Sequence, residues 1–192
     1  MLSSIDRQLY PENEFPYGQW EYQIFYRENF DKAKQSLEDN PRNTVKCLFR
    51  SGNAENLGKL ANTAFVRKNN GWFKNGIAPD IALDESVLSR KELEIYSKYL
   101  SENGFFGPGS WYMNTELNYE YYKKAPLQKL KKPTLFIHAK YDRVCDTCHT
   151  SLADSMRENC SNLTEATIES GHWMAQEKPD DVNKTIKEWL AI

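Results

Sequence analysis

The pattern of hydrophobic and polar residues changes character about two thirds of the way along the chain. Before Lys131, apolar residues recur at helical spacing between polar loops, whereas Thr134 to Ala139 is a nearly continuous apolar run behind Pro133. Such a run is typical of a strand that is covered on both faces in a parallel sheet. We therefore expect a helical first part followed by an α/β second part.

The helical part has recognisable start and stop signals. Ser89 followed by Glu92 is a capping box that opens a helix, and Gly104 can take the left-handed conformation that ends it. A loop interrupted by proline and glycine covers Tyr10 to Trp20, and turn-forming residues cluster from Asn69 to Gly76. The expected helices run over about 24–38, 41–50, 90–103 and 116–123.

The second part alternates between strand and helix patterns. Strands are expected over 134–139 and 164–168, each followed by a helix, over about 150–158 and from Pro179 onward. This order predicts two parallel strands joined by a right-handed crossover. Two strands do not make a stable sheet alone, so further strands are implied that this chain does not supply. We accordingly expect the isolated chain to be poorly soluble.

An aspartate and a histidine stand just past the two expected strands. Asp142 closes the turn after the first strand, and His172 follows the second strand within Ser170-Gly171-His172-Trp173. This order suits the orienting acid and general base of a hydrolase triad. The alternative is a turn aspartate and an unrelated loop histidine. A nucleophile on a Gly-x-nucleophile-x-Gly turn should precede both residues, and the sequence contains none.

Composition limits the function classes. The 192 residues are 40% hydrophobic, 27% charged and 13% aromatic, enough for a sizeable core and an apolar pocket in one domain or two small ones. The net charge of −2 gives no reason to expect a nucleic-acid partner. No apolar stretch is long enough for a membrane span, and no signal peptide is apparent, so a cytoplasmic protein with four reduced cysteines is expected.

One further motif competes for a function. Cys145-Asp146-Thr147-Cys148-His149 matches the C-x-x-C-H pattern of haem attachment, which would require an export compartment. A disulfide or zinc role for the two thiols is the other alternative, although Cys47 and Cys160 offer no second C-x-x-C pair. We expect neither a cofactor nor a metal. His138, inside the apolar run, is expected to be a hydrogen-bonded core histidine.

Several segments, taken in order, resemble the cap and C-terminal portion of the epoxide hydrolases of the α/β-hydrolase fold. They extend over nearly the whole chain, and the Tyr-Gln and Gly-Phe-x-Gly-Pro segments distinguish this family from dehalogenases and esterases of the same fold. The segments are Glu21 to Tyr26, the helix bearing Tyr96, Gly104 to Pro108 with Trp111-Tyr112, Ala139 to Asp142, and Ser170 to Trp173.

The resemblance implies a role for each matching residue. Tyr22 and Tyr96 match the lid tyrosines whose hydroxyls hold the epoxide oxygen, Asp142 matches the charge-relay acid, and His172 matches the base that activates water. On pattern alone Tyr96, with Leu93 and Leu100 at helical spacing, would be a core aromatic residue. The resemblance also implies substrate-binding residues, which are Trp173 beside the base and, on the cap side, Gln23 and Tyr26.

The resemblance also implies a fold and a reaction. We expect a partial α/β-hydrolase fold, with a helical cap over residues 1–125 and the last two parallel strand–helix units of the core over 126–192. The family's reaction takes a small apolar epoxide and water to a vicinal diol through an ester on an aspartate.

The family's His-Gly-x-Pro and Gly-x-Asp-x-Gly segments are absent from the sequence. We therefore expect a truncated chain that is inactive alone, with the missing N-terminal half as a candidate partner in trans. A non-catalytic remnant or interaction module, and a dehalogenase or esterase of the same fold, remain the alternatives.

Overall fold

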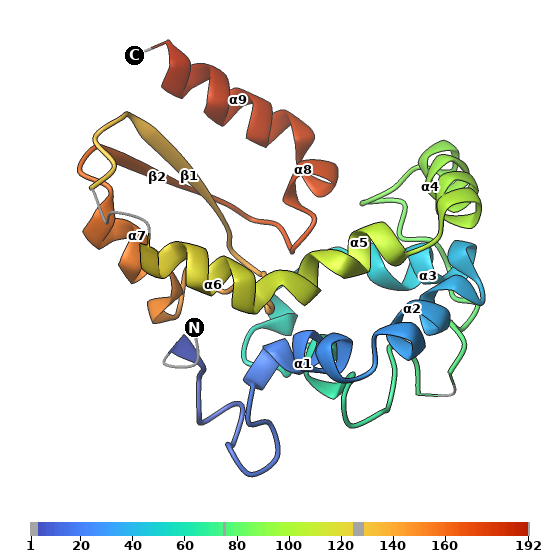
Figure 1. Ribbon diagram of the computed structural model, residues 1–192. Coiled ribbons are helices and arrows are strands. Elements are labelled where there is room, and N and C mark those ends of the chain that lie inside the picture. Colours follow the sequence, from blue (N-terminus) through green and yellow to red (C-terminus); the bar gives the residue numbers. More distant parts are fainter. Residues whose placement is uncertain (1–3, 75, 125–128, 192) are drawn as a thin grey trace.

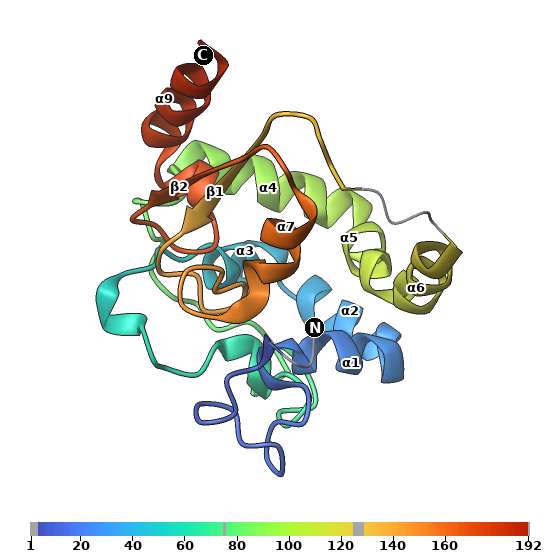
Figure 2. The ribbon, with the colours of Figure 1, turned by 90° about the vertical axis from the view of Figure 1, so that its left-hand side faces the viewer.

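The computed structural model describes residues 4–74, 76–124 and 129–191, and it has a helical part and a smaller part with a two-stranded sheet (Figure 1). The boundary expected between residues 125 and 126 lies outside the described residues. The helical part is wrapped by loops and short 3-10 turns, seen from the side in Figure 2. Those turns are Gly18–Trp20, Ala54–Asn56, Asn62–Phe65 and Trp111–Asn114.

The expected single helix over 24–38 is wrong. Two helices occupy this region, α1 (Glu21–Glu28) and α2 (Phe30–Glu38), and Asn29 between them has extended φ of −145° and ψ of 53°. Asn29 ends one helix and begins the next: its backbone N–H donates to the Phe25 carbonyl at 2.8 Å, and its carbonyl accepts from the Ala33 N–H at 2.9 Å. The third helix, α3 (Pro41–Leu48), begins where Asn40 accepts a hydrogen bond from the Asn43 N–H at 3.0 Å.

The capping box is confirmed at the start of α4 (Arg90–Asn103). The Ser89 side chain accepts from the Glu92 N–H at 3.2 Å, and the Glu92 carboxylate accepts from the Ser89 N–H at 2.7 Å. Gly104 ends the helix at φ +69°. A short helix that the sequence did not predict, α5 (Phe106–Ser110), precedes the expected α6 (Thr115–Lys124).

The second part contains the two strands where they were expected. β1 (Thr134–Ala139) and β2 (Leu163–Ile168) are parallel, with Thr134 opposite Leu163 and Ala139 opposite Ile168. The helix expected over 150–158 is a 3-10 turn, Ser151–Ala153, followed by α7 (Asp154–Asn159). The chain continues through α8 (Met174–Glu177) to α9 (Pro179–Leu190).

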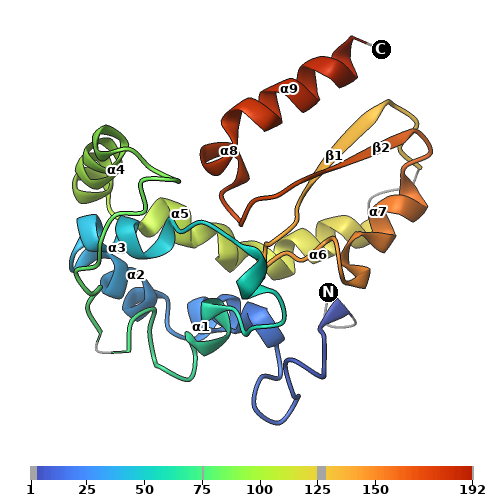
Figure 3. The same ribbon diagram turned by 180° about the vertical axis from the view of Figure 1, so that it is seen from behind.

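The strands are less covered than the apolar run predicts. Helix α9 lies along the sheet and contacts both strands (Figures 1 and 3). Of the β1 residues only His138 is buried, and the others are half-buried. In the described residues the sheet has two strands, and the further strands that the apolar run implies are not among them.

Two apolar clusters make the core of the helical part. The larger gathers aromatic residues around α1, among them Trp20, Phe25 and Tyr26. The smaller lies between α3 and α4, and Trp173 from the second part packs against it; its buried members are Val45, Phe49, Val87, Leu88 and Leu93. The second cluster therefore connects the two parts.

The two parts also touch through their backbones. Gly52 and Gly171 approach so closely that a Cβ on Gly52 would lie 2.4 Å from the Cα of Gly171. The Glu177 carboxylate accepts hydrogen bonds from both glycine N–H groups, at 3.3 and 2.9 Å. The Trp173 indole donates to the Leu48 carbonyl at 2.7 Å. We refer to these contacts as the glycine junction.

Within residues 4–74, 76–124 and 129–191, no helix is both long enough and apolar enough to cross a bilayer.

Replacing Gly52 by alanine should destabilise the fold, because the added methyl group would overlap Gly171. We expect a loss of about 1–3 kcal/mol in the free energy of unfolding, the usual cost of overpacking. The measurement is urea denaturation followed by circular dichroism. Gly107→Ala is the matched control, since nothing lies within 4 Å of its Cβ position. Equal midpoints for the two variants would contradict the close approach at the glycine junction.

Candidate active site

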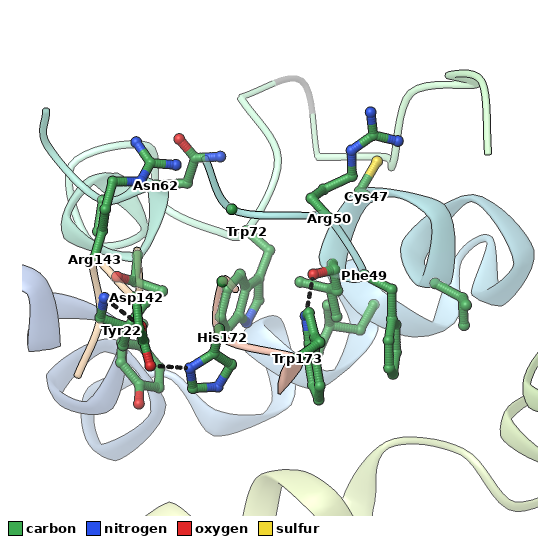
Figure 4. Close-up of a pocket in the computed structure, with 18 of the residues that line it drawn as sticks. Tyr22, Cys47, Phe49, Arg50, Asn62, Trp72, Asp142, Arg143, His172 and Trp173 are labelled. Atoms are coloured by element: carbon green, nitrogen blue, oxygen red, sulfur yellow. Dashed lines mark hydrogen bonds and ion pairs between the residues drawn. The ribbon is translucent and has the colours of Figure 1, made fainter. Parts of the chain in front are cut away.

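A cavity of about 440 Å³ lies where the helical part meets the loops that follow β1 and β2 (Figure 4). Its lining comes mainly from α1, the end of α3, α4 and those two loops, with further residues from the segments around Thr63 and Trp72 and from the turn Trp111–Asn114. The residues predicted from the sequence that line it are Tyr22, Tyr26, Tyr96, Asp142, His172 and Trp173.

The strand pairing brings Asp142 and His172 together. Beyond the last residues of β1 and β2, the Tyr141 N–H donates to the Ser170 carbonyl at 2.9 Å, which continues the parallel pairing into both loops. The buried Asp142 carboxylate accepts from the N–H groups of Val144 and Cys145 at 2.8 and 3.0 Å. Its second oxygen lies 2.9 Å from His172 Nδ1 (Figure 4). The two loops therefore bring Asp142 and His172 together as a hydrogen-bonded acid–base pair.

Hydrogen bonding favours the charged form of each partner. The hydrogen bond to Asp142 raises the pKa of His172 against the opposing effect of burial. Burial opposes ionisation of Asp142, but the hydrogen bond and charge of His172, together with two backbone N–H groups, lower the pKa of this carboxyl below its ordinary value. An ionised Asp142 accepts the proton of Nδ1, which leaves Nε2 of His172 as the basic nitrogen.

The two tyrosines of α1 are held by aromatic and polar contacts. The Tyr22 ring meets Tyr112 edge to face at 5.2 Å, and the Gln23 amide donates to the Tyr22 hydroxyl at 3.1 Å. Tyr26 stacks on Tyr112 at 5.2 Å and accepts from the Trp72 indole at 3.1 Å. Burial raises the pKa of Tyr22 well above its ordinary value and that of Tyr26 to about 12. Both side chains therefore stay protonated at neutral pH.

A row of aromatic rings connects Tyr96 to the base. Tyr96 lies 5.0 Å from Phe49, and Phe49 stacks on Trp173 at 4.1 Å. Trp173 in turn meets the His172 ring edge to face at 5.2 Å. These contacts place Tyr96 on the same cavity as His172 although α4 and the β2 loop are far apart in sequence.

The structure thus brings six of the seven predicted site residues to one cavity. Gln23 is not among the described residues that line it, and it contributes through its hydrogen bond to Tyr22. Sequence reasoning did not single out Phe49, Trp72 or Tyr112 as site residues, although each lines the cavity. The high aromatic content of the sequence favoured an apolar pocket, but composition alone does not identify which aromatic residues line it.

The two cysteines of the C-x-x-C-H motif lie in different surroundings. Cys145 lies beside Asp142 and His172, where burial and the Asp142 charge raise the pKa of its thiol to about 11. Cys148 lies in a separate, more open pocket with Thr167, and His149 Nδ1 lies 2.9 Å from an Asp146 oxygen. All four cysteines are free thiols.

His138 is buried and hydrogen-bonded, as predicted. Its Nδ1 lies 2.8 Å from the Thr147 hydroxyl, and its Nε2 lies 2.8 Å from Glu165.

Comparison with known proteins gives a consistent set of relatives. No family model matches the chain. Bifunctional epoxide hydrolase 2 of Rattus norvegicus is 32% identical over 174 residues, which are 88% of this chain and 29% of that protein. Epoxide hydrolase A of Mycobacterium tuberculosis is 30% identical over 104 residues, 54% of this chain and 32% of that protein. The chain therefore spans about a third of the length of these curated relatives.

Solved structures share the fold. Epoxide hydrolase A from Mycobacterium thermoresistibile superposes with a TM-score of 0.68 at 21% identity, over 88% of this chain and 51% of that one. A Vigna radiata epoxide hydrolase mutant gives a TM-score of 0.65 at 19% identity, over 96% of this chain and 55% of that one. Together they show that this structure corresponds to about half of an α/β-hydrolase fold.

The Asp142→Asn variant should lower the pKa of His172, because the neutral amide no longer stabilises the imidazolium while burial still opposes it. An NMR titration of the ring protons measures this. In the parent chain the raised pKa stabilises the fold below the ordinary histidine pKa of about 6.5, and this stabilisation is lost as the pH rises through the raised value. The variant should therefore show less of that pH dependence. Asp146→Asn, which alters the partner of His149, should leave the pKa of His172 unchanged. An unshifted His172 titration in Asp142→Asn would contradict the pairing.

Proposed function

We propose that this chain, which is related to the epoxide hydrolases of the α/β-hydrolase fold, carries the lid and general-base half of an active site that hydrolyses epoxides to vicinal diols. The observation that carries the proposal is the Asp142–His172 hydrogen bond on the same cavity as Tyr22 and Tyr96. An acid–base pair facing two phenols is the arrangement that ring opening followed by ester hydrolysis requires.

In the first step the phenols act on the epoxide oxygen. As a carboxylate attacks one ring carbon, the C–O bond breaks and negative charge develops on oxygen, where hydroxyl donors stabilise it or supply a proton. Burial supports this role for Tyr22, because its raised pKa keeps the proton on the phenol until charge develops. The Gln23 amide, by donating to the same hydroxyl, leaves the Tyr22 proton free to point elsewhere.

In the second step His172 acts on water. Nε2 takes a proton from a water molecule as that water attacks the ester carbonyl, and Asp142 stabilises the imidazolium that forms. Collapse of the tetrahedral intermediate passes its hydroxyl proton to the leaving alkoxide, which regenerates the carboxylate and releases the diol. The proton taken up by His172 replaces the one that the phenol supplied during ring opening. His172 is suited to this step because its side chain is 46% exposed while Asp142 is only 8% exposed. The base can reach water, and its partner stays shielded.

The attacking carboxylate is proposed to come from polypeptide outside these 192 residues, either joined to them or bound in trans. The sequence contains no Gly-x-Asp-x-Gly turn and no His-Gly-x-Pro segment. Without a covalent nucleophile the rate falls by several orders of magnitude. We therefore propose that these residues alone do not turn over epoxides.

The cavity lining supports a small apolar substrate. Rings and aliphatic side chains make up most of the wall, including Trp72, Phe49 and Leu100. Arg50 and Arg143 stand on either side of the cavity in Figure 4, and each guanidinium donates to a backbone carbonyl, of Ala82 and Leu60 respectively.

Fusing this chain to the part of the Mycobacterium thermoresistibile enzyme that it does not match supplies the absent half. In such a folded fusion, Tyr22→Phe and Tyr96→Phe should each lower the rate of diol formation from styrene oxide by about 10²-fold, the usual cost of losing one donor to a developing oxyanion. Chiral chromatography of the diol measures the rate. Tyr99→Phe, on the same helix and exposed, is the control. Unchanged epoxide opening in both variants would refute the assignment of Tyr22 and Tyr96 as the lid tyrosines.

His172→Gln in the same fusion should stop the reaction at the ester, because ring opening does not need the base but hydrolysis does. Mass spectrometry of the intact protein should then show a covalent adduct of one epoxide. His149→Gln, which alters an imidazole away from the cavity, should turn over without accumulating an adduct. Diol formation by His172→Gln at the parent rate would exclude His172 as the base.

A further inference from the structure

The thiol of Cys145 lies in the Asp142–His172 corner and has no part in the proposed hydrolysis. A carboxylate oxygen of Asp142, the Cys145 Sγ and a ring nitrogen of His172 all lie within 4.8 Å of one another. Within the described residues this is the one group of three such side chains with a metal-ligating arrangement. We propose that Asp142, Cys145 and His172 form a binding site for a zinc ion.

The donor set selects the metal. A thiolate, an imidazole and a carboxylate are the three kinds of ligand that Zn²⁺ takes in proteins, whereas Mg²⁺ and Ca²⁺ prefer sites made of oxygen alone. Bonds of about 2.0–2.3 Å to a tetrahedral zinc ion place ligand atoms about 3–4 Å apart. The most widely separated ligand atoms of the cluster therefore need to approach each other by about 1–2 Å to fit around the ion.

One ligand is fixed and the others have room to adjust. Asp142 is buried, and the N–H groups of Val144 and Cys145 hold its carboxylate in place. His172 is nearly half exposed, so its ring can shift toward the ion. The Asp142 charge, which disfavours a bare thiolate at Cys145, also offsets the two positive charges of zinc. Three protein ligands leave a fourth position for water, as in open zinc sites.

The neighbouring cysteines do not share this geometry. Cys148, three residues along the same loop, lies in the pocket with His138 and Thr167. Cys47 lines the cavity, but its thiol contacts the Pro79 carbonyl at 3.6 Å and is outside the cluster. Cys148 therefore provides a matched control for Cys145.

Zinc binding at this corner would compete with the acid–base pair. If Nδ1 of His172 ligates the ion, it no longer donates a hydrogen bond to Asp142. If Nε2 ligates the ion, it can no longer take a proton from water. The zinc site itself does not depend on the proposed hydrolysis, because it needs neither the nucleophile nor turnover. Failure of one proposal is therefore distinguishable from failure of the other.

Direct titration of the purified 192-residue chain tests the site. Isothermal titration calorimetry with ZnCl₂ should show one ion bound, and CoCl₂ should give the near-ultraviolet absorption of a thiolate–cobalt bond. Cys145→Ser should abolish that absorption and weaken zinc binding at least about tenfold, in line with the effects of altered metal ligation. Cys148→Ser should change neither, and MgCl₂ should give no signal. Zinc binding of equal affinity in Cys145→Ser, or none in the parent chain, would overturn the proposal.

A labelling measurement on the unaltered chain guards against a variant that fails to fold. Zinc should slow the reaction of iodoacetamide with Cys145, as mapped by peptide mass spectrometry, and leave the reaction of Cys148 unchanged. Equal labelling of Cys145 with and without zinc would overturn the site.

Discussion

The backbone contact between Gly52 and Gly171 is the constraint on which the cavity depends. No side chain separates the segment after α3 from the loop that carries His172, and one carboxylate, Glu177, binds the N–H groups of both. The neighbouring hydrogen bond from Trp173 to Leu48 and its stacking on Phe49 extend the same junction. The helical part is thereby held over the loops that follow the sheet, and the cavity is the space left between them.

The buried phenols of Tyr22 and Tyr26 supply the cavity with neutral hydrogen-bond donors. Tyr22 and Tyr26 share the Tyr112 ring, so three hydroxyl-bearing rings from α1 and the turn before α6 form one wall. Burial around Tyr22 and Tyr26 disfavours their phenolate forms, which preserves the capacity of these two hydroxyls to donate. The Asp142–His172 pair, which lines the same cavity, has the reverse property, since it stabilises charge. The cavity therefore combines neutral hydroxyl donors with an ionisable base.

The features that were predicted correctly are those that a few consecutive residues determine. The β1 run, the Ser89–Glu92 capping box and the placement of Asp142 and His172 beyond the strands all follow from short stretches of sequence. The break at Asn29 and the exposure of the sheet depend on what packs against each element, which periodicity does not contain. Tyr96 was predicted only in part by its local pattern. Its helical spacing indicates a core residue, and it does pack on Phe49, but it also lines the cavity. Only the family resemblance distinguished it.

The pairing of β1 with β2 extends past the strands into the loops through Tyr141 and Ser170. A slip of two residues between parallel strands displaces one against the other by about 6.6 Å, more than twice the length of a hydrogen bond. Asp142 and His172 meet in this register and would be separated in the next. The register of two short strands that carry no reacting group thus sets the distance between the Asp142 carboxylate and the His172 ring. A substitution that shifted the β1–β2 register would therefore be as harmful to this pair as a substitution of either residue.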